Sequence, residues 1–295
     1  IYPRSNQAQS VVDVLVMKAR SLKVKLKTNQ TVTGVSFADG QWKIHTDGWT
    51  YSGDAVILAN GSRASSVAGS CESGYEIAKS LGHHLIEPLP ALTALKCKGN
   101  SFSGWSGVRT EGTITLYIDG TPTVSQQGEL QLTDYGVSGI PVFQISRYAI
   151  RAVHENKNVE LSINFFPELS RKELEEYLEH RKAACPYKTE KELLIGLFPE
   201  KLIRVLCAQK DLIRGITDFR LPVKNGLSFE QAQVCSGGVD TSEVHSKTME
   251  SRLHKGLYFA GELLDIDGTC GGYNLQWAWS SGAAAGIWAA KEEEK

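Results

Sequence analysis

The residues with the clearest chemical potential lie near the carboxyl end of the chain, where an apolar run is followed by glycine and an acid. Leu257 to Ala260 is uninterrupted by polar residues and ends at Gly261 and Glu262. Such a run is typical of a parallel strand buried on both faces, and ligands bind at the carboxyl ends of these strands. The sequence therefore predicts an open backbone and a carboxylate at a ligand-binding edge.

A pair of glycines then precedes a helix predicted over residues 275–290. Gly271 and Gly272 stand directly before Tyr273, Asn274 and Leu275. The first N–H groups of a helix have no partner within it and carry the positive end of its dipole. They can hold an anion or an electron-rich ring edge, such as the N1 and C2 carbonyl of a reduced flavin. The same glycines could instead serve only a tight turn and helix packing, and spacing does not separate these two interpretations.

Two further segments carry weaker signals. The buried run 55–59 ends at Asn60 and Gly61, where a glycine would let a bound cofactor approach the backbone. Asp265 and Asp267 precede a glycine in a pattern that suggests a calcium loop, but the later glycine and the terminal glutamate of such a loop are missing. There is also no Gly-x-Gly-x-x-Gly turn on a first βαβ unit. The residues alone predict an α/β ligand-binding protein without a metal site.

Other reactive side chains favour structural roles. His83 and His84 follow a predicted helix over residues 74–81, which favours a cationic cap or a surface pair over catalysis. Tyr135 and Ser138 flank glycines in a loop that could serve a turn or face a substrate equally well. No Ser-His-Asp arrangement can be argued from spacing. The six cysteines form no Cys-x-x-Cys pair, so we expect buried free thiols in a reducing compartment.

Composition excludes several classes of protein. The 295 residues contain 41% hydrophobic and 22% charged residues, which is ordinary globular usage. The balance of 32 Lys and Arg against 33 Asp and Glu gives a net charge of -1, so no global attraction to nucleic acid or an anionic membrane exists. No apolar stretch approaches the roughly 20 residues that span a bilayer, and nothing resembles a signal peptide. We expect a cytoplasmic protein with a small-molecule substrate.

The elements that must position these residues change in character along the chain. A helix is predicted over residues 6–19 with Ser5 as its N-cap, followed by an antiparallel meander with strands at 23–26, 30–37, 42–46 and 49–51. Short alternating segments from about 88 to 166 predict a β-barrel or sandwich. A helical region follows, in which Ser170 and Glu173 form a capping-box pattern. Beyond residue 231 the α/β character returns.

Five segments carry a resemblance to a known family. The chain resembles the BaiN/RdsA family of NAD(P)/FAD-dependent oxidoreductases, which includes aminoacetone-oxidase-like flavoproteins. The match extends over essentially the full length, and the last of its segments is long and unusual enough to be specific. The segments are Ile1 to Ala8, Tyr135 to Pro141, Gly237 to Val239, Thr248 to Ser251 and Gly256 to Gly282.

The resemblance implies an α/β fold of the glutathione-reductase type, with FAD as cofactor and NAD(P)H as a possible electron donor. It implies a discontinuous FAD-binding domain at 1–88 and 232–295 around an inserted substrate domain at 89–231, β-rich over 89–166 and helical over 167–231. No catalytic residue is assigned. The residues expected at the cofactor are Arg4, Asn60, Gly61, Gly261, Glu262, Asp267, Gly271, Gly272, Tyr273, Asn274 and Leu275.

The chain departs from the family pattern in two places. Family members carry a dinucleotide-binding βαβ unit before the position of Ile1, so we expect that unit to be supplied in cis or as a separate chain. Where many relatives have a Gly-Gly pair, this sequence has Asn60-Gly61. The first departure affects the binding of the adenine and pyrophosphate of FAD. The family's βαβ unit would hold these groups, whereas the Gly271-Gly272 turn would contact only the flavin end.

The function implied is hydride transfer through flavin to or from a small organic substrate. An enone-like or steroid-like skeleton and an amine are both compatible with the resemblance. Two alternatives stay open: a non-catalytic binding protein with a flavoprotein-like fold, and an RNA-modifying flavoenzyme. The second would need a basic face, which the balanced charge does not favour.

Overall fold

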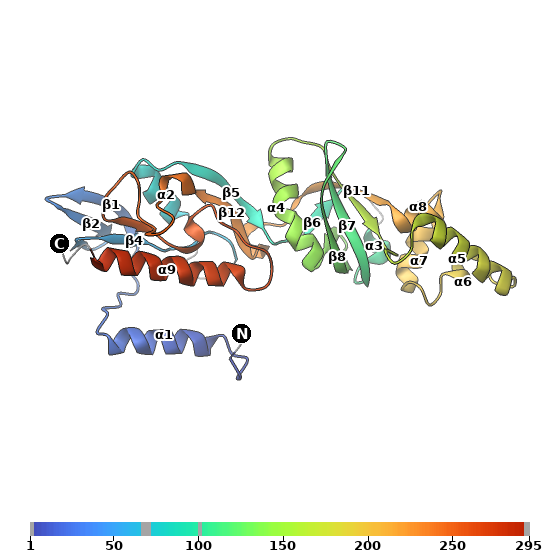
Figure 1. Ribbon diagram of the computed structural model, residues 1–295, viewed down its shortest axis with the longest axis horizontal. Helices are drawn as coiled ribbons and strands as arrows, with labels where there is room; N and C mark the ends of the chain where they lie inside the picture. Colours follow the sequence, from blue (N-terminus) through green and yellow to red (C-terminus); the bar gives the residue numbers. More distant parts are fainter. Residues whose placement is uncertain (1–2, 66–71, 100–101, 292–295) are drawn as a thin grey trace. The chain divides into compact units, whose positions relative to one another are not determined.

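The computed structural model describes residues 3–65, 72–99 and 102–291 of the chain (Figure 1). Contacts within it divide the chain into two units, residues 1–53 and residues 54–295. Cys71 lies outside the described residues, and the five described cysteines are free. No helix in the described part of the chain is long and apolar enough to cross a membrane.

The first unit holds one helix and a three-stranded antiparallel sheet in the order β1-β2-β3. Trp42 on the central strand is buried, and the left-handed Asp39 and Gly40 form the tight turn between the first two strands, as the sequence predicts. The elements are α1 (Gln9–Ser21), β1 (Val32–Ala38), β2 (Gln41–Thr46) and β3 (Thr50–Gly53).

Two expectations for this unit are wrong. Ser5 does not cap the helix, because α1 begins three residues later than predicted and its N-cap is Ala8, without a side-chain bond. Ser5 bonds instead to Ser10 through their hydroxyl groups, 3.0 Å apart. Residues 23–26 form no strand, because Lys23 adopts a left-handed conformation that breaks extended backbone immediately after the helix.

The second unit is built around a parallel pair and an antiparallel pair of strands. Strand β4 (Val56–Leu58) pairs in parallel with β13 (Leu257–Phe259), 201 residues further along the chain, with Leu58 opposite Phe259. Strand β5 (Leu85–Ala91) pairs antiparallel with β12 (Val234–Val239). Helices α2 (Ser73–Ser80) and α9 (Tyr273–Lys291) accompany them, and α9 packs against β13 and β4.

A closed barrel lies between β5 and β12 in sequence, with strands in the cyclic order β10-β11-β6-β9-β8-β7. The sequence left barrel and sandwich open, and the structure has the barrel. Helix α4 (Ile140–His154) packs against β8, β11 and β5 (Figure 1). The strands are β6 (Leu95–Cys97), β7 (Arg109–Ile118), β8 (Thr121–Leu132), β9 (Gly136–Ser138), β10 (Val159–Asn164) and β11 (Phe219–Gly226).

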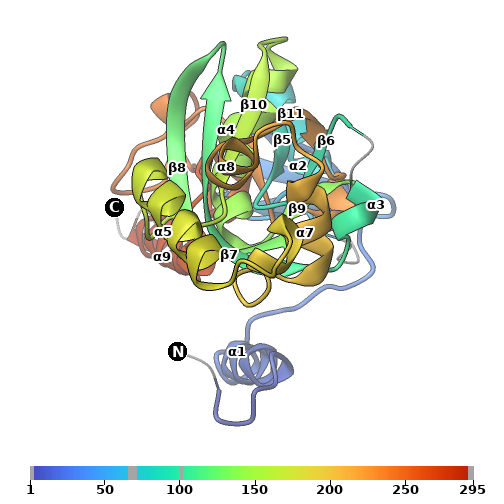
Figure 2. The same ribbon diagram turned by 90° about the vertical axis from the view of Figure 1, so that its right-hand side faces the viewer.

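Four helices follow β10 before the chain returns to the barrel as β11 (Figure 2). The capping box predicted at Ser170 and Glu173 is confirmed, with both of its reciprocal hydrogen bonds present. The region expected to be helical also contains β11, which closes the barrel between β10 and β6. The helices are α5 (Arg171–Ala184), α6 (Glu190–Leu193), α7 (Glu200–Cys207) and α8 (Leu212–Thr217).

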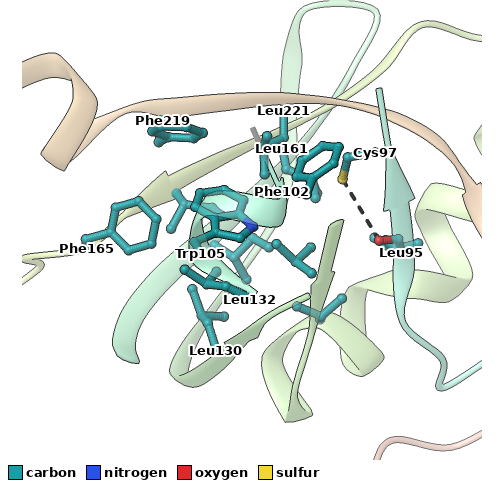
Figure 3. Packing of buried hydrophobic residues seen from close by; sticks show 14 of the residues in the cluster. Leu95, Cys97, Phe102, Trp105, Leu130, Leu132, Leu161, Phe165, Phe219 and Leu221 are labelled. Atoms are coloured by element: carbon teal, nitrogen blue, oxygen red, sulfur yellow. Dashed lines mark hydrogen bonds between the residues drawn. The ribbon is translucent and has the colours of Figure 1, made fainter. Parts of the chain in front are cut away.

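In the described residues, the barrel and the helices after β10 surround a large apolar core. Trp105 on the short helix α3 (Phe102–Trp105) is fully buried there, with its ring centroid 5.2 Å from that of Phe219 (Figure 3). Its indole N–H donates to the Thr133 carbonyl over 3.1 Å, which satisfies the one polar group that the ring brings inside. Gly136 and Gly139 are required by packing, since an added Cβ would lie 2.3 Å and 2.6 Å from backbone oxygens of neighbouring strands.

Candidate functional site

The parallel pair brings two of the predicted segments to one edge. The Ala260 N–H donates to the Leu58 carbonyl over 3.0 Å, so β4 and β13 end side by side. Asn60 and Gly61 follow the first strand and Gly261 follows the second. Segments 200 residues apart thus converge where ligands bind in parallel sheets.

Glu262 is the polar centre of this edge. Its Oε1 accepts hydrogen bonds from the Ser62 hydroxyl and from the Cys235 N–H, both at 2.7 Å. Burial raises the pKa of the Glu262 carboxyl above its ordinary value, and the two hydrogen bonds act against that rise. The side chain therefore ties together the loop after β4, strand β12 and the 3-10 turn η3 (Gly261–Leu263), using a single oxygen.

Two buried side chains with ionisable groups, a tyrosine and a cysteine, lie beside this carboxylate, and the sequence did not single them out. Tyr75 on α2 and Cys235 on β12 are both almost wholly buried. Burial is the main cause that raises the pKa of each side chain, and the charge of Glu262 adds to the rise in both. Both groups stay neutral near pH 7. Their place beside Glu262 depends on contacts between segments that are distant in sequence, which residue spacing cannot show.

The Gly261 backbone is engaged by the final helix. Gly261 has φ +72° and donates its N–H to the Ser281 hydroxyl over 2.9 Å, while its carbonyl accepts from the Trp277 indole over 3.0 Å. Ser281 is buried. Both backbone polar groups of Gly261 are therefore bonded to α9 and hold this helix against the end of β13. The role that remains for Gly261 at a ligand is to let the ligand approach the backbone closely.

The start of α9 carries unpaired donors. Gly271 and Gly272 have φ of +121° and +93°, and the first bond of the helix runs from the Gln276 N–H to the Gly272 carbonyl over 3.0 Å. Within the described residues the N–H groups of Tyr273 and Leu275 have no protein acceptor. An added Cβ at Gly272 would meet nothing within 4 Å. The turn is open to a ligand, and its donors fit an electron-rich ring edge.

Asn274 fixes this turn from within. Its side-chain carbonyl accepts the Gly268 N–H over 2.7 Å, and its amide donates to the Gly268 carbonyl over 3.1 Å. Both ends of the amide are thereby used, which closes the loop between Gly268 and the helix. Asn274 thus acts by shaping the loop.

Asp267 faces the protein interior. Its side chain is 3% exposed, and the Arg147 guanidinium lies 3.1 Å from Oδ2 while donating to the Asp267 carbonyl over 2.8 Å. Burial raises the pKa of this carboxyl, and Arg147 acts against the rise. Arg151, one turn further along α4, donates to the Ser236 carbonyl over 3.1 Å. Two arginines therefore attach α4 to the loop before α9 and to β12.

Asn60 lies over the first turn of α2. An added Cβ at Gly74 would fall 1.9 Å from the Asn60 amide nitrogen, so a larger residue at position 74 would displace the exposed Asn60 side chain. Gly61 has φ +73°. The remaining predicted residue, Arg4, lies in a turn of the first unit, and its role at a cofactor stays a prediction.

A separate arrangement brings together a serine, a histidine and a carboxylate. His83 Nδ1 lies 2.9 Å from Glu243 Oε2, and His83 Nε2 lies 2.9 Å from the Ser251 hydroxyl. Ser251 is buried and its oxygen accepts the N–H groups of Leu253 and His254 at 3.0 Å. A hydroxyl that accepts two N–H bonds and donates to Nε2 braces the loop and presents no nucleophile.

The expectation of a surface pair is wrong for His83 and right for His84. The His83 side chain is fully buried, whereas that of His84 is 81% exposed. Burial lowers the pKa of His83, and the hydrogen bond to Glu243 raises the pKa of His84. Among the residues that the structure describes, no three His, Cys, Asp or Glu side chains are grouped to hold a metal.

The parallel strands, the glycine turn and the final helix are features of an α/β protein of the Rossmann type. The chain belongs to the family described as HI0933-like protein Rossmann domain, which matches residues 1–288. The resemblance drawn from the sequence is confirmed, and with it the class of enzyme, a flavin-dependent oxidoreductase.

Three relatives give this class more detail. The chain is 42% identical, over 99% of its length and 75% of the relative, to a 3-dehydro-bile acid delta(4,6)-reductase of Clostridium scindens. It is 30% identical, over 94% of its length and 70% of the relative, to a ribosomal RNA dihydrouridine synthase of Escherichia coli. The same kind of enzyme from Haemophilus influenzae is 32% identical over 79% of this chain and 59% of the relative.

Proposed function

We propose that this protein reduces a carbon–carbon double bond conjugated to a carbonyl in a small polycyclic substrate, with FAD as cofactor and NAD(P)H as electron donor. The observation that supports it best is the 42% identity to a bile-acid delta(4,6)-reductase over nearly the whole chain. Bound FAD, once reduced, supplies the hydride in such chemistry, and the protein supplies binding, orientation and electrostatics.

In this proposal the open turn before α9 holds the flavin ring. The unpaired N–H groups at Tyr273 and Leu275 would face the N1 and C2 carbonyl edge, where reduction places negative charge. Glu262 has Oε2 left for a ribityl hydroxyl, since Oε1 accepts both described bonds. Asp267 and Asn274 would act by holding the loop, through Arg147 and Gly268.

The pyrophosphate end of FAD calls for a further segment, supplied in cis or as a separate chain. Two observations support it. The parallel sheet has only two strands in the described residues, and α9 exposes large apolar side chains, including Trp279 at 55% and Ile287 at 56%. A helix that is apolar around its circumference is normally covered, and parallel sheets are normally wider. Additional strands beside β4 and β13 would bury both.

We infer a cytoplasmic location from the free thiols. Cys97, Cys185, Cys207, Cys235 and Cys270 are all unpaired, as in proteins of a reducing compartment.

A second candidate is reduction of uridine in RNA, favoured by the 30% identity to a ribosomal RNA dihydrouridine synthase. The bond reduced would again be conjugated to a carbonyl. The net charge of -1 argues against it, because RNA binding relies on a basic surface.

The test is turnover by the protein carrying FAD. A 3-oxo-Δ4 steroid carboxylate should lose its enone absorbance when NAD(P)H is supplied, with one NAD(P)H oxidised for each double bond reduced. Uridine-containing ribosomal RNA fragments should be unchanged. Reduction of the RNA with no reduction of the steroid would contradict the proposal in favour of the second candidate.

A further inference from the structure

Two arginines fasten one face of helix α4 to β12 and to the loop that leads to the open turn before α9. Arg147 donates to the Asp267 carbonyl over 2.8 Å, and its guanidinium lies 3.1 Å from the carboxylate of the same residue. One turn further along, Arg151 donates to the Ser236 carbonyl of β12 over 3.1 Å. The face of α4 that carries both arginines is therefore the face turned toward β12 and this loop.

The contact continues from Arg147 toward the start of α4. Phe143, one turn before Arg147, and Cys270, directly before the glycine pair, are both partly buried against the same small apolar cluster. As α4 is followed back toward its first residue, its partners on the loop advance from Asp267 to the neighbourhood of Cys270. The first turn of α4 is therefore the part of this helix nearest to the open turn. The cluster consists of Ala91, Leu92 and Val234.

Helix geometry places Ile140 on this same face. Ile140 stands seven residues before Arg147 and eleven before Arg151, which is about two turns and about three turns at about 3.6 residues per turn. Its side chain consequently projects within about 20° of both arginines. With a rise of about 1.5 Å per residue, it lies about 10 Å beyond Arg147 along the helix axis, toward the open turn.

The face is covered at Arg147 and uncovered at Ile140. Ile140 is 60% exposed, although the next two residues of the helix are buried. On the loop, Gly272 has open space around it and Tyr273 is 64% exposed. The contact between α4 and the loop therefore ends before Ile140 and the glycine turn, and it leaves apolar surface on both.

The position of Ile140, more than its exposure, points to a ligand. Folded proteins expose many apolar atoms, so an exposed isoleucine alone carries no argument. Ile140, however, lies on the face of α4 that is in contact elsewhere, beside a turn whose free N–H groups fit a flavin edge. A flat ring system stacked on that flavin would cover the isoleucine side chain and remove it from water.

We propose that Ile140 is a specificity-determining residue that packs against the ring system of the substrate, on the side of the substrate opposite the flavin. The inference rests on the proposed function, because it takes the flavin ring to lie at the open turn. It goes beyond that function by placing the substrate between the start of α4 and the flavin, and by naming a residue that contacts it.

Steady-state kinetics of the FAD-loaded protein with an uncharged 3-oxo-Δ4 steroid tests the contact. Ile140→Ala removes part of the apolar wall and should raise the KM for the steroid about fivefold. The kcat should stay within twofold, because a wall contact binds substrate and transition state alike. Ile140→Asp should raise the KM at least tenfold, since its carboxylate would lose water against the rings. FAD affinity should be unchanged in both variants.

Ile195→Asp is the matched control. Ile195 is 59% exposed, almost the same as Ile140, and it stands two residues after the end of α6. Its replacement should leave the KM, the kcat and the FAD affinity at their wild-type values. An unchanged thermal midpoint in every variant establishes that the protein is folded.

Flavin fluorescence tests the placement of Ile140 without any substrate. An indole close to an isoalloxazine ring quenches its fluorescence by electron transfer. Ile140→Trp should therefore shorten the fluorescence lifetime of the bound flavin, and Ile195→Trp should leave it unchanged. Equal lifetimes in these two variants would overturn the placement.

The failure of this inference can be told apart from the failure of the proposed function. If the wild-type protein reduces the steroid and Ile140→Asp keeps the wild-type KM, the inference fails and the proposed function stands. The saturated 3-oxo steroid serves as a binding probe, measured through the shift that it causes in the flavin absorbance. If Ile140→Asp weakens binding of this probe and Ile140→Trp quenches the flavin, while no enone is reduced, the proposed function fails alone.

Discussion

Single residues decide how the edge of the β4–β13 pair is used. One carboxylate oxygen of Glu262 accepts hydrogen bonds from two distant segments, and both backbone polar groups of Gly261 are hydrogen-bonded to α9. The backbone at Gly61 and at Gly272 is open, since an added Cβ at either residue would meet nothing within 4 Å. The residues that hold the scaffold and those that face a ligand can therefore be separated by their hydrogen bonds.

Gly272 is the sharpest test at this scale. Gly272→Val places a β-branched side chain at φ +93°, which costs about 1–3 kcal/mol of backbone strain and fills the open turn. We expect FAD affinity to fall at least tenfold, measured by flavin fluorescence. Gly282→Val is the control, because Gly282 lies within α9, has an ordinary φ and has open space around it. Equal FAD affinity in the two variants would show that the turn does not contact the flavin.

His83 predicts a pH dependence of stability. Its pKa is lowered in the folded state, so the unfolded chain binds more protons and stability falls as the pH drops below about 6.5. The slope from this group reaches at most about 1.4 kcal/mol per pH unit. His83→Gln, which keeps an acceptor and a donor, should flatten the slope in urea unfolding measured between pH 7 and pH 5.

His84→Gln is the comparison with opposite sign. The pKa of His84 is raised, so its stabilising contribution is present at low pH and is lost as the pH rises through that raised value. Removing it should steepen the fall of stability toward low pH. Matching slopes in the two variants would mean that burial of His83 does not control its protonation.

At the scale of elements, strands, helices and caps that depend on local sequence patterns were predictable. Contacts that join segments distant in sequence were not. The strands at 55–59 and 257–260, the helix before residue 290 and the Ser170 capping box all follow from short-range patterns of apolar, glycine and capping residues. Closure of the barrel by β11 and the bonds from Glu262 to Ser62 and Cys235 join segments tens to hundreds of residues apart. Ser5 failed as a cap because a capping residue alone does not fix where a helix begins.

The attachment of α4 to the loop before α9 is testable by removing Arg147. Arg147→Met leaves the buried Asp267 carboxylate without its cation and should lower the free energy of unfolding by about 2–4 kcal/mol. Adding Asp267→Asn should recover part of this loss, because no buried charge then remains. Arg109→Met is the control, since its pair with Glu129 is exposed on both sides and should contribute less than about 1 kcal/mol. A loss in Arg147→Met no larger than this would contradict the attachment.

At the scale of the whole molecule, the barrel and its helices form an insertion with a core of its own. All buried residues of the main apolar cluster lie between Leu95 and Val223. The chain enters this insertion from β5 and leaves it into β12, and these two strands are neighbours because Ala91 on β5 pairs with Val234 on β12. The boundaries predicted at 88 and 231 stay predictions, and these paired strands lie close to both.

A fragment of residues 92–233 should therefore fold by itself. We expect a cooperative thermal transition and a near-ultraviolet circular dichroism signal from the buried Trp105. The complementary deletion, with Asn-Gly joining Ala91 to Val234, should keep β5 and β12 paired as a hairpin. A fragment with helical signal but without cooperative unfolding would show that the insertion depends on the rest of the chain.

The central claim is that the open turn before α9 binds the ring of a flavin, and that this flavin reduces a conjugated double bond of the substrate. The most direct measurement is the flavin absorbance of the FAD-loaded protein under anaerobic conditions, first with NAD(P)H and then with a 3-oxo-Δ4 steroid carboxylate. The account predicts that NAD(P)H bleaches the flavin absorbance and that one equivalent of the steroid restores it as the enone absorbance disappears. Flavin that NAD(P)H reduces, but that the steroid leaves reduced with its enone intact, would contradict the account.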